Sequence, residues 1–177
     1  MLVTKPKWVL HLLLSAAACA PASTPLTDAG REAVTNEVKA VLAELTSAMN
    51  SRDGEAVVSF YSDSPDFLYL GCTDFLIGGA TFRQMVTPYY GPARDVTFEQ
   101  RIVSIQALSP TVAVVSQRGS STEAEALFWT QVLVKRDGRW VITQEHESWP
   151  GCNPPREPHP FTTPGDSASL QPGGIAK

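Results

Sequence analysis

The chain has 177 residues, of which 43% are hydrophobic, and its formal net charge is -4. This length and hydrophobic content suffice for one ordinary core, so we expect a single domain. Lys and Arg form no cluster in the body of the chain. The acidic balance and the lack of a basic stripe argue against a phosphate-tracking groove, and no nucleic acid partner is predicted.

The first residues have the pattern of an export signal. A short positive segment precedes an apolar stretch and small residues, and the stretch is too short for a mature transmembrane helix. Residues 1–18 are therefore predicted to be a signal peptide. Three alanines before Cys19 resemble a bacterial lipobox, in which Cys19 becomes the lipidated first residue, although lipoboxes usually carry Leu where Ala16 stands. Ordinary cleavage after Ala18, Ala20 or Ala22 is the alternative.

Residues 19–27 follow as a short polar tether of the kind that separates a domain from a membrane. With Cys19 acylated, the protein would be a lipoprotein of the bacterial cell envelope that faces the periplasm. With ordinary cleavage, it would be secreted.

The mature domain is expected to begin with a long amphipathic helix that ends at Asn50 and is capped by Thr27 or Asp28. A second, short helix is expected over residues 55–61. The first helix carries an apolar stripe at helical spacing, and this stripe makes it a core element. The residues of the stripe are Val34, Val38, Val41, Leu42, Leu45 and Met49.

Two short strands are predicted next, over residues 67–71 and 73–77, and a third helix over residues 80–90, interrupted by Pro88. From Asp95 onward the pattern changes to long strands, over residues 95–108, 111–119, 124–136 and 139–149. Helices followed by a meander of strands predict an α+β domain with helices packed on one face of a sheet.

The last two strands flank Asp137-Gly138, a strong indicator of a two-residue hairpin. If Arg136 faces Arg139, counting along an unbroken ladder pairs Lys135 with Trp140 and Leu133 with Ile142. Because side chains alternate along a strand, the paired residues share one face. The same count places Gln131 opposite Gln144, Trp129 opposite His146 and Leu127 opposite Ser148. The other face of the last strand, with Val141, Thr143, Glu145 and Glu147, is expected to meet solvent or a wet interface.

The cysteines predict a disulfide. An exported chain meets an oxidising compartment, and Cys72 and Cys152 remain as a pair whether Cys19 is acylated or removed. Two free buried thiols are the alternative. Beyond Cys152 the chain is dense in Pro and Gly without a hydrophobic period, so residues 153–177 are expected to be a disordered tail.

The order of these elements resembles the nuclear transport factor 2-like superfamily, in its SnoaL-like branch. The resemblance rests on the segment MNSRDGEAVVSFYSD after the first helix, on the strand pair with its Gly-Gly exit, and on DGRWVITQEHESW at the end. It covers about residues 28–149, and we take 28–152 as the domain. The resemblance implies a curved, mostly antiparallel sheet wrapped around about three helices, a cone with a pocket at its open end. It also implies a first strand parallel to the last, which brings Cys72 near Cys152.

The resemblance implies that an enzyme of this kind, such as a ketosteroid isomerase, would carry a catalytic Asp on the first strand. In this chain Leu70 or Gly71 occupies that place. Asp66 and Asp74 are weak candidates, since Asp beside a turn is usually a solvated cap. His146 is the one His inside the domain, so a site with several His ligands is excluded and neither metal nor cofactor is expected. It could be a general base, but a structural or ligand-orienting role is favoured. The expected pocket residues are Tyr69, Trp129, Gln131, Gln144, His146 and Ser148, with Tyr69 and Trp129 as core residues the alternative.

Three functions remain open. The leading hypothesis is an envelope-anchored cone that binds a small, largely apolar molecule. The second is an isomerase, cyclase or lyase that uses His146 with a carboxylate such as Asp66 or Asp74. The third is a module for protein interaction or homodimerisation through the outer face of the sheet.

Overall fold

The computed structural model describes residues 25–72, 75–93 and 95–152. Along the chain it has α1 (Asp28–Asn50), α2 (Gly54–Ser59), β1 (Leu68–Leu70), β2 (Phe75–Ile77) and α3 (Gly79–Tyr89). Four long strands follow, β3 (Phe98–Ser109), β4 (Val112–Ser121), β5 (Ala124–Arg136) and β6 (Arg139–Ser148). The predicted α+β class and the order of its elements are confirmed.

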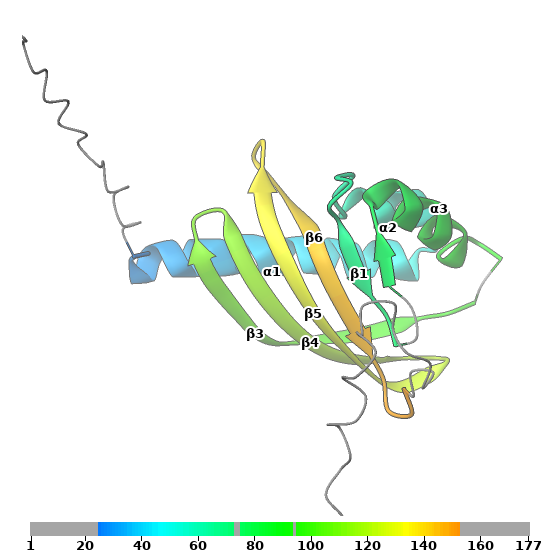
Figure 1. Ribbon diagram of the computed structural model, residues 1–177. Helices are drawn as coiled ribbons and strands as arrows, with labels where there is room; N and C mark the ends of the chain where they lie inside the picture. The colour runs from blue at the N-terminus through cyan, green and yellow to red at the C-terminus, as the bar shows by residue number, and fades with distance from the viewer. Residues whose placement is uncertain (1–24, 73–74, 94, 153–177) are drawn as a thin grey trace, which may run out of the picture.

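The six strands form one curved sheet in the order β2-β1-β6-β5-β4-β3. Neighbouring strands are antiparallel, except that β1 lies parallel beside β6, as the resemblance implied. Helix α1 crosses one face of the sheet, and α2 and α3 lie near β1 and β2 (Figure 1). The sheet therefore wraps around the helices and leaves one end of the enclosed space bordered by α3 and the end of β6.

Helix α1 forms where its apolar stripe meets the inner face of the sheet. Thr27 caps the helix by accepting a hydrogen bond from the Gly30 backbone N–H at 3.1 Å. Val38 and Leu45 on the stripe are fully buried, in the same core cluster as Leu133 and Ile142 of the hairpin strands. At the far end Asn50 bonds the backbone of Phe98 in both directions, which joins the end of the helix to the start of β3.

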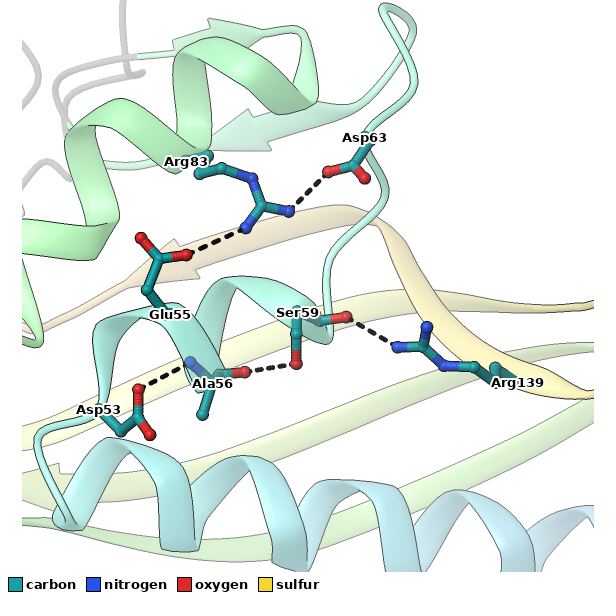
Figure 2. Close-up of polar contacts among 7 residues, drawn as sticks. All are labelled: Asp53, Glu55, Ala56, Ser59, Asp63, Arg83 and Arg139. Atoms are coloured by element: carbon teal, nitrogen blue, oxygen red, sulfur yellow. Dashed lines mark hydrogen bonds and ion pairs between the residues drawn. The ribbon is translucent and has the colours of Figure 1, made fainter.

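Polar contacts hold α2 and α3 in place (Figure 2). Asp53 caps α2 through the Ala56 N–H at 2.9 Å, and Arg139 of β6 donates to the Ser59 carbonyl at the other end. Arg83 of α3 makes ion pairs with Glu55 and Asp63. These contacts fix the short helices relative to β6, so α3 presents a constant face to the end of that strand.

A β-bulge in β6 overturns the predicted register. The pairs Lys135–Trp140 and Leu133–Ile142 are present, but the ladder shifts between Val132 and Leu133 because Thr143 is an extra residue. Thr143 donates its hydroxyl hydrogen bond to the Val132 carbonyl at 3.2 Å. The expected pairs Gln131–Gln144, Trp129–His146 and Leu127–Ser148 are therefore wrong. Instead Gln131 lies opposite Glu145, Trp129 opposite Glu147, Thr130 opposite His146 and Phe128 opposite Ser148.

The predicted disulfide between Cys72 and Cys152 is present, with the two Cα atoms 5.4 Å apart. It links the segment after β1 to the segment after β6, as expected for neighbouring parallel strands. Cys19, the predicted signal peptide and the tail lie outside the described residues. Within the described ranges, no helix combines the length and apolar character required to cross a membrane.

Candidate functional site

A cavity of about 230 Å³ lies between α3, β1 and the end of β6. We call it the inner cavity. Met85 and Val86 of α3 line one side, and two carboxylates, those of Glu145 and Glu147 on β6, line another. The remaining wall consists of aromatic side chains. They are Tyr61, Tyr69, Phe82, Tyr89, Tyr90 and Trp149.

The aromatic wall is part of the packed core at its inner end. Phe82 of α3 packs against the rings of Tyr61, Phe67 and Tyr69, with ring centroids 4.6 to 5.6 Å apart. Toward solvent, Tyr89 and Trp149 are about two-fifths exposed, at 40% and 38%. The inner end of the cavity is therefore lined by packed aromatic rings, and its rim is an accessible aromatic surface.

Glu145 is the most deeply buried charged group of the site, with 4% of its surface exposed. The hydroxyl of Tyr61 donates to its Oε2 atom at 2.9 Å, and the Gln131 amide donates to the same oxygen at 2.5 Å. Gln117 in turn donates to the Gln131 carbonyl oxygen at 2.9 Å. This row of buried side chains orients the Gln131 amide so that its N–H points at Glu145.

Glu147 lies two residues further along β6 and faces the same way. The Tyr69 hydroxyl of β1 donates to its Oε2 atom at 2.8 Å. The sheet topology makes this contact possible, because β1 runs parallel beside β6. Two carboxylates thus share one apolar cavity, each with a tyrosine donor.

The electrostatic consequence is a raised pKa for both carboxyl groups. Burial and then the neighbouring charge of Glu147 raise the pKa of Glu145 from 4.5 to about 7, against hydrogen bonds from Gln131 and Tyr61. Burial also raises the pKa of Glu147, against hydrogen bonds from Tyr69 and Trp129. Near neutral pH, Glu145 can therefore donate or accept a proton, and the pair can bind a polar group of a ligand.

A wider depression of about 590 Å³ adjoins the inner cavity. It shares Tyr89, Glu147 and Trp149 with the inner cavity and extends over Phe98 and Leu127. Glu147 therefore lies at the boundary between the two spaces. Among the described residues, no group of three or more His, Cys, Asp or Glu side chains is placed to hold a metal ion.

The structure divides the predicted pocket residues between the two faces of the sheet. Tyr69 lines the inner cavity, and Trp129 and Gln131 are buried beside it. Gln144 and His146 are exposed on the outer face, and Ser148 lies on the same face. The bulge at Thr143 exchanges the inward and outward side chains of β6 beyond that residue. His146 is thus away from the cavity that it was expected to line.

The carboxylate candidates fall outside the lining of this cavity in one case and outside the described residues in the other. Asp66 is exposed in the turn before β1, where its backbone N–H bonds the Ser64 hydroxyl. Asp74 lies outside the described residues. Glu145 and Glu147 were predicted to meet solvent or a wet interface, and Tyr61 and Tyr90 were not predicted as site residues. Side-chain alternation along β6 identifies Glu145 and Glu147 as inward residues once the bulge at Thr143 is included.

Comparisons with known proteins agree with this fold. The model of the SnoaL-like domain family matches residues 38–151, more than half of the chain. No curated protein matches the sequence. Among solved structures, an NTF-2 like protein of unknown function from Shewanella oneidensis MR-1 has a TM-score of 0.57 at 22% identity, covering 64% of this chain and 98% of that chain.

Two further structures show the same similarity of fold. A cystatin-like fold protein from Burkholderia xenovorans lb400 has a TM-score of 0.57 at 19% identity, over 66% of this chain and 92% of that chain. A domain of unknown function with a cystatin-like fold from Nostoc punctiforme has a TM-score of 0.57 at 12% identity, over 66% and 77%. The chain therefore belongs to the SnoaL-like domain family, and it shares its fold with an NTF-2 like protein.

Proposed function

We propose that this domain binds a small, largely apolar molecule in the inner cavity, with a polar group of that molecule held at Glu145 and Glu147. The observation that carries the proposal is the pairing of a buried carboxylate, Glu145, and a partly buried one, Glu147, with an aromatic wall. Such a combination of apolar lining and a few convergent polar groups is typical of small-molecule sites.

The energetics also support a binding role. Burying a carboxylate without a cationic partner opposes folding, and apolar residues of similar size would stabilise the same core better. Glu145 and Glu147 make no salt bridge with any described residue. Their hydrogen-bond donors are neutral: Tyr61 and Gln131 for Glu145, and Tyr69 and Trp129 for Glu147. Two such groups in one core are a feature expected of a functional site more than of a structural one.

Obstruction of the cavity tests this proposal. Val86→Phe adds bulk to a partly buried side chain that lines the inner cavity. The matched control, Val103→Phe, makes the same chemical change at a side chain that is 63% exposed on β3. In a thermal-shift screen of small aromatic and alicyclic molecules, hits should stabilise the wild type and Val103→Phe but not Val86→Phe. Equal responses in the three proteins would place binding elsewhere, and a screen with no hits would refute the proposal.

A second candidate function is proton-transfer catalysis by an isomerase-, cyclase- or lyase-type enzyme. The observation in its favour is a Glu145 pKa of about 7, next to Glu147 in the same cavity. A general acid or base works best with a pKa near the working pH. In this version the two glutamates replace His146, which is exposed on the other face. The test is the exchange of α-protons of small cyclic ketones in deuterated water. Exchange by the wild type that is absent in Glu147→Gln would support catalysis. A lack of exchange in the wild type would refute catalysis and retain only the binding function.

We also propose export and anchoring through Cys19. The disulfide between Cys72 and Cys152 supports an oxidising compartment. Mass spectrometry of the mature N-terminus tests the anchor: a diacylglyceryl group on Cys19 is expected, and an unmodified start at another residue would refute it.

Homodimerisation through the outer face of the sheet stays a prediction. That face carries partly exposed valines on β4 and β5 and the exposed side chain of Phe128. Light scattering with size exclusion should give twice the monomer mass, and Phe128→Glu should return it to the monomer mass.

A further inference from the structure

The inner cavity combines negative charge with aromatic faces and contains no positive group. Its lining includes Glu145 and Glu147 and six aromatic rings, but no Lys, Arg or His among the described residues. The faces of aromatic rings carry negative potential and attract cations, most strongly where water is excluded. The aromatic rings and the carboxylates therefore favour the same sign of charge in a ligand.

The hydrogen bonds leave one oxygen of Glu145 available. The hydrogen bonds from Tyr61 and from Gln131 both reach Oε2. Among the described residues, no group donates a hydrogen bond to Oε1, although only 4% of the Glu145 surface is exposed and the residue lines the cavity. The Tyr69 bond to Glu147 likewise reaches Oε2. Neutral donors thus hold both carboxylates, with Trp129 a second donor to Glu147, and no described residue gives either carboxylate a counter-charge.

Resting on the function proposed above, we infer that the ligand is an organic cation: an apolar body that carries a protonated amine or a quaternary ammonium group. The ammonium group lies between the carboxylates of Glu145 and Glu147, in contact with the rings of Tyr69 and Tyr90. The apolar body fills the space beside Phe82 and Val86. A neutral ligand of the same shape would leave the two carboxylates without a charge partner.

Cation binding is coupled to the ionisation of Glu145. The titratable groups that face this carboxyl are Tyr61 before β1, Tyr69 on β1, Tyr90 after α3 and Glu147 on β6, and Gln131 on β5 is its neutral donor. No Lys, Arg or His of the described residues lines the cavity beside it. A bound cation favours the ionised form, so binding near pH 7 expels a proton from Glu145. Affinity should consequently rise as the pH rises through 7.

A matched pair of probes tests the inference. Phenyltrimethylammonium and tert-butylbenzene have the same shape and differ by one positive charge. By NMR titration of the wild-type domain at pH 7.5, we expect the cation to bind at least about tenfold more tightly than the neutral compound. Glu145→Gln and Glu147→Gln should each weaken the cation about tenfold or more and leave the neutral compound unchanged. Glu32→Gln, at an exposed position of α1, is the control.

Calorimetry supplies a readout that a structural role would not change. Phenyltrimethylammonium has no ionisable proton, so a proton released on binding comes from the protein. Wild-type binding enthalpies should differ between buffers of different ionisation enthalpy, and those of Glu145→Gln should not. Equal or tighter binding of tert-butylbenzene would overturn the inference and leave the proposed function intact. Failure of both probes, with the thermal-shift screen also negative, would refute the proposed function as well.

Discussion

Glu145 links the stability of the domain to pH. Its pKa rises from 4.5 to about 7 on folding, so the folded state binds its proton more tightly than the unfolded state does. Between these values the unfolded state loses its proton first, and the free energy of unfolding falls as the pH rises. Below about pH 4.5 this stabilising contribution is fully present, and above about pH 7 it is lost.

We expect Glu145→Gln to remove this dependence. Gln has nearly the same shape and can accept the hydrogen bonds of Tyr61 and Gln131 through its carbonyl oxygen, but it carries no charge. At pH 8 the variant should be more stable than the wild type by up to about 3 kcal/mol, and at pH 4.5 the difference should be small. Urea unfolding at both pH values measures this change. If Glu145→Gln and Glu32→Gln behave alike, the carboxyl is not buried as described.

At the scale of elements, the bulge at Thr143 decides which side chains of β6 face the helices. Ile142 and Glu145 both point inward because Thr143 and Gln144 together occupy the outward step between them. Ile142 and Glu145 are three residues apart, whereas in a regular strand two inward side chains are an even number of residues apart. The irregularity of a single strand therefore brings Glu145 and Glu147 into the cavity and turns His146 away from it.

This arrangement makes deletions in β6 informative. A chain without Thr143 should keep the pair Gln131–Glu145 in a regular ladder, at a loss of about 1 to 3 kcal/mol, since it lacks the bond to the Val132 carbonyl and the local bend. A chain without His146 should instead turn Glu147 outward, away from Tyr69. NMR titration of the glutamate carboxyl carbons distinguishes the two: a raised Glu147 pKa should persist in the first deletion and vanish in the second. The reverse result would contradict the assigned register.

The same element shows how far sequence reasoning reached. The helix stripe through Val38 and Leu45, the hairpin at Asp137-Gly138 and the pair Leu133–Ile142 follow from local periodicity and turn chemistry, and the structure has all three. The bulge does not follow from such local rules, because Thr143 is an ordinary strand residue and its extra position is set by the ladder with Val132 and Leu133. A register shift by one residue exchanges the two faces of a strand. On β6, Gln144, His146 and Ser148 were consequently predicted to line the pocket in place of Glu145 and Glu147, whereas Tyr69 of the predicted set does line it.

At the scale of the whole molecule, the disulfide joins two distant parts of the chain at one end of the sheet. Cys72 and Cys152 are 80 residues apart in sequence, and a crosslink across so long a loop removes much of the freedom of the unfolded chain. Replacing both cysteines with Ser should lower the free energy of unfolding by about 2 to 5 kcal/mol in urea titrations.

A reducing agent provides the control for this prediction. It should bring the wild type to the stability of the double Ser variant and should leave the variant unchanged. A wild type that is insensitive to reduction would show that the two thiols are not paired in solution.

The parallel pairing of β1 with β6 also constrains how the molecule can fold. Leu68 of β1 pairs with Gln144 of β6. Strand β1 therefore cannot form its parallel pairing until β6 is available. Ribosomal synthesis delivers these segments in order, and loop closure over such a distance slows folding. Until then Leu68–Leu70 lack the parallel strand that pairs with them. The domain therefore completes its core only after its C-terminal strand has emerged, and a growing chain would have to be kept from aggregating throughout that interval.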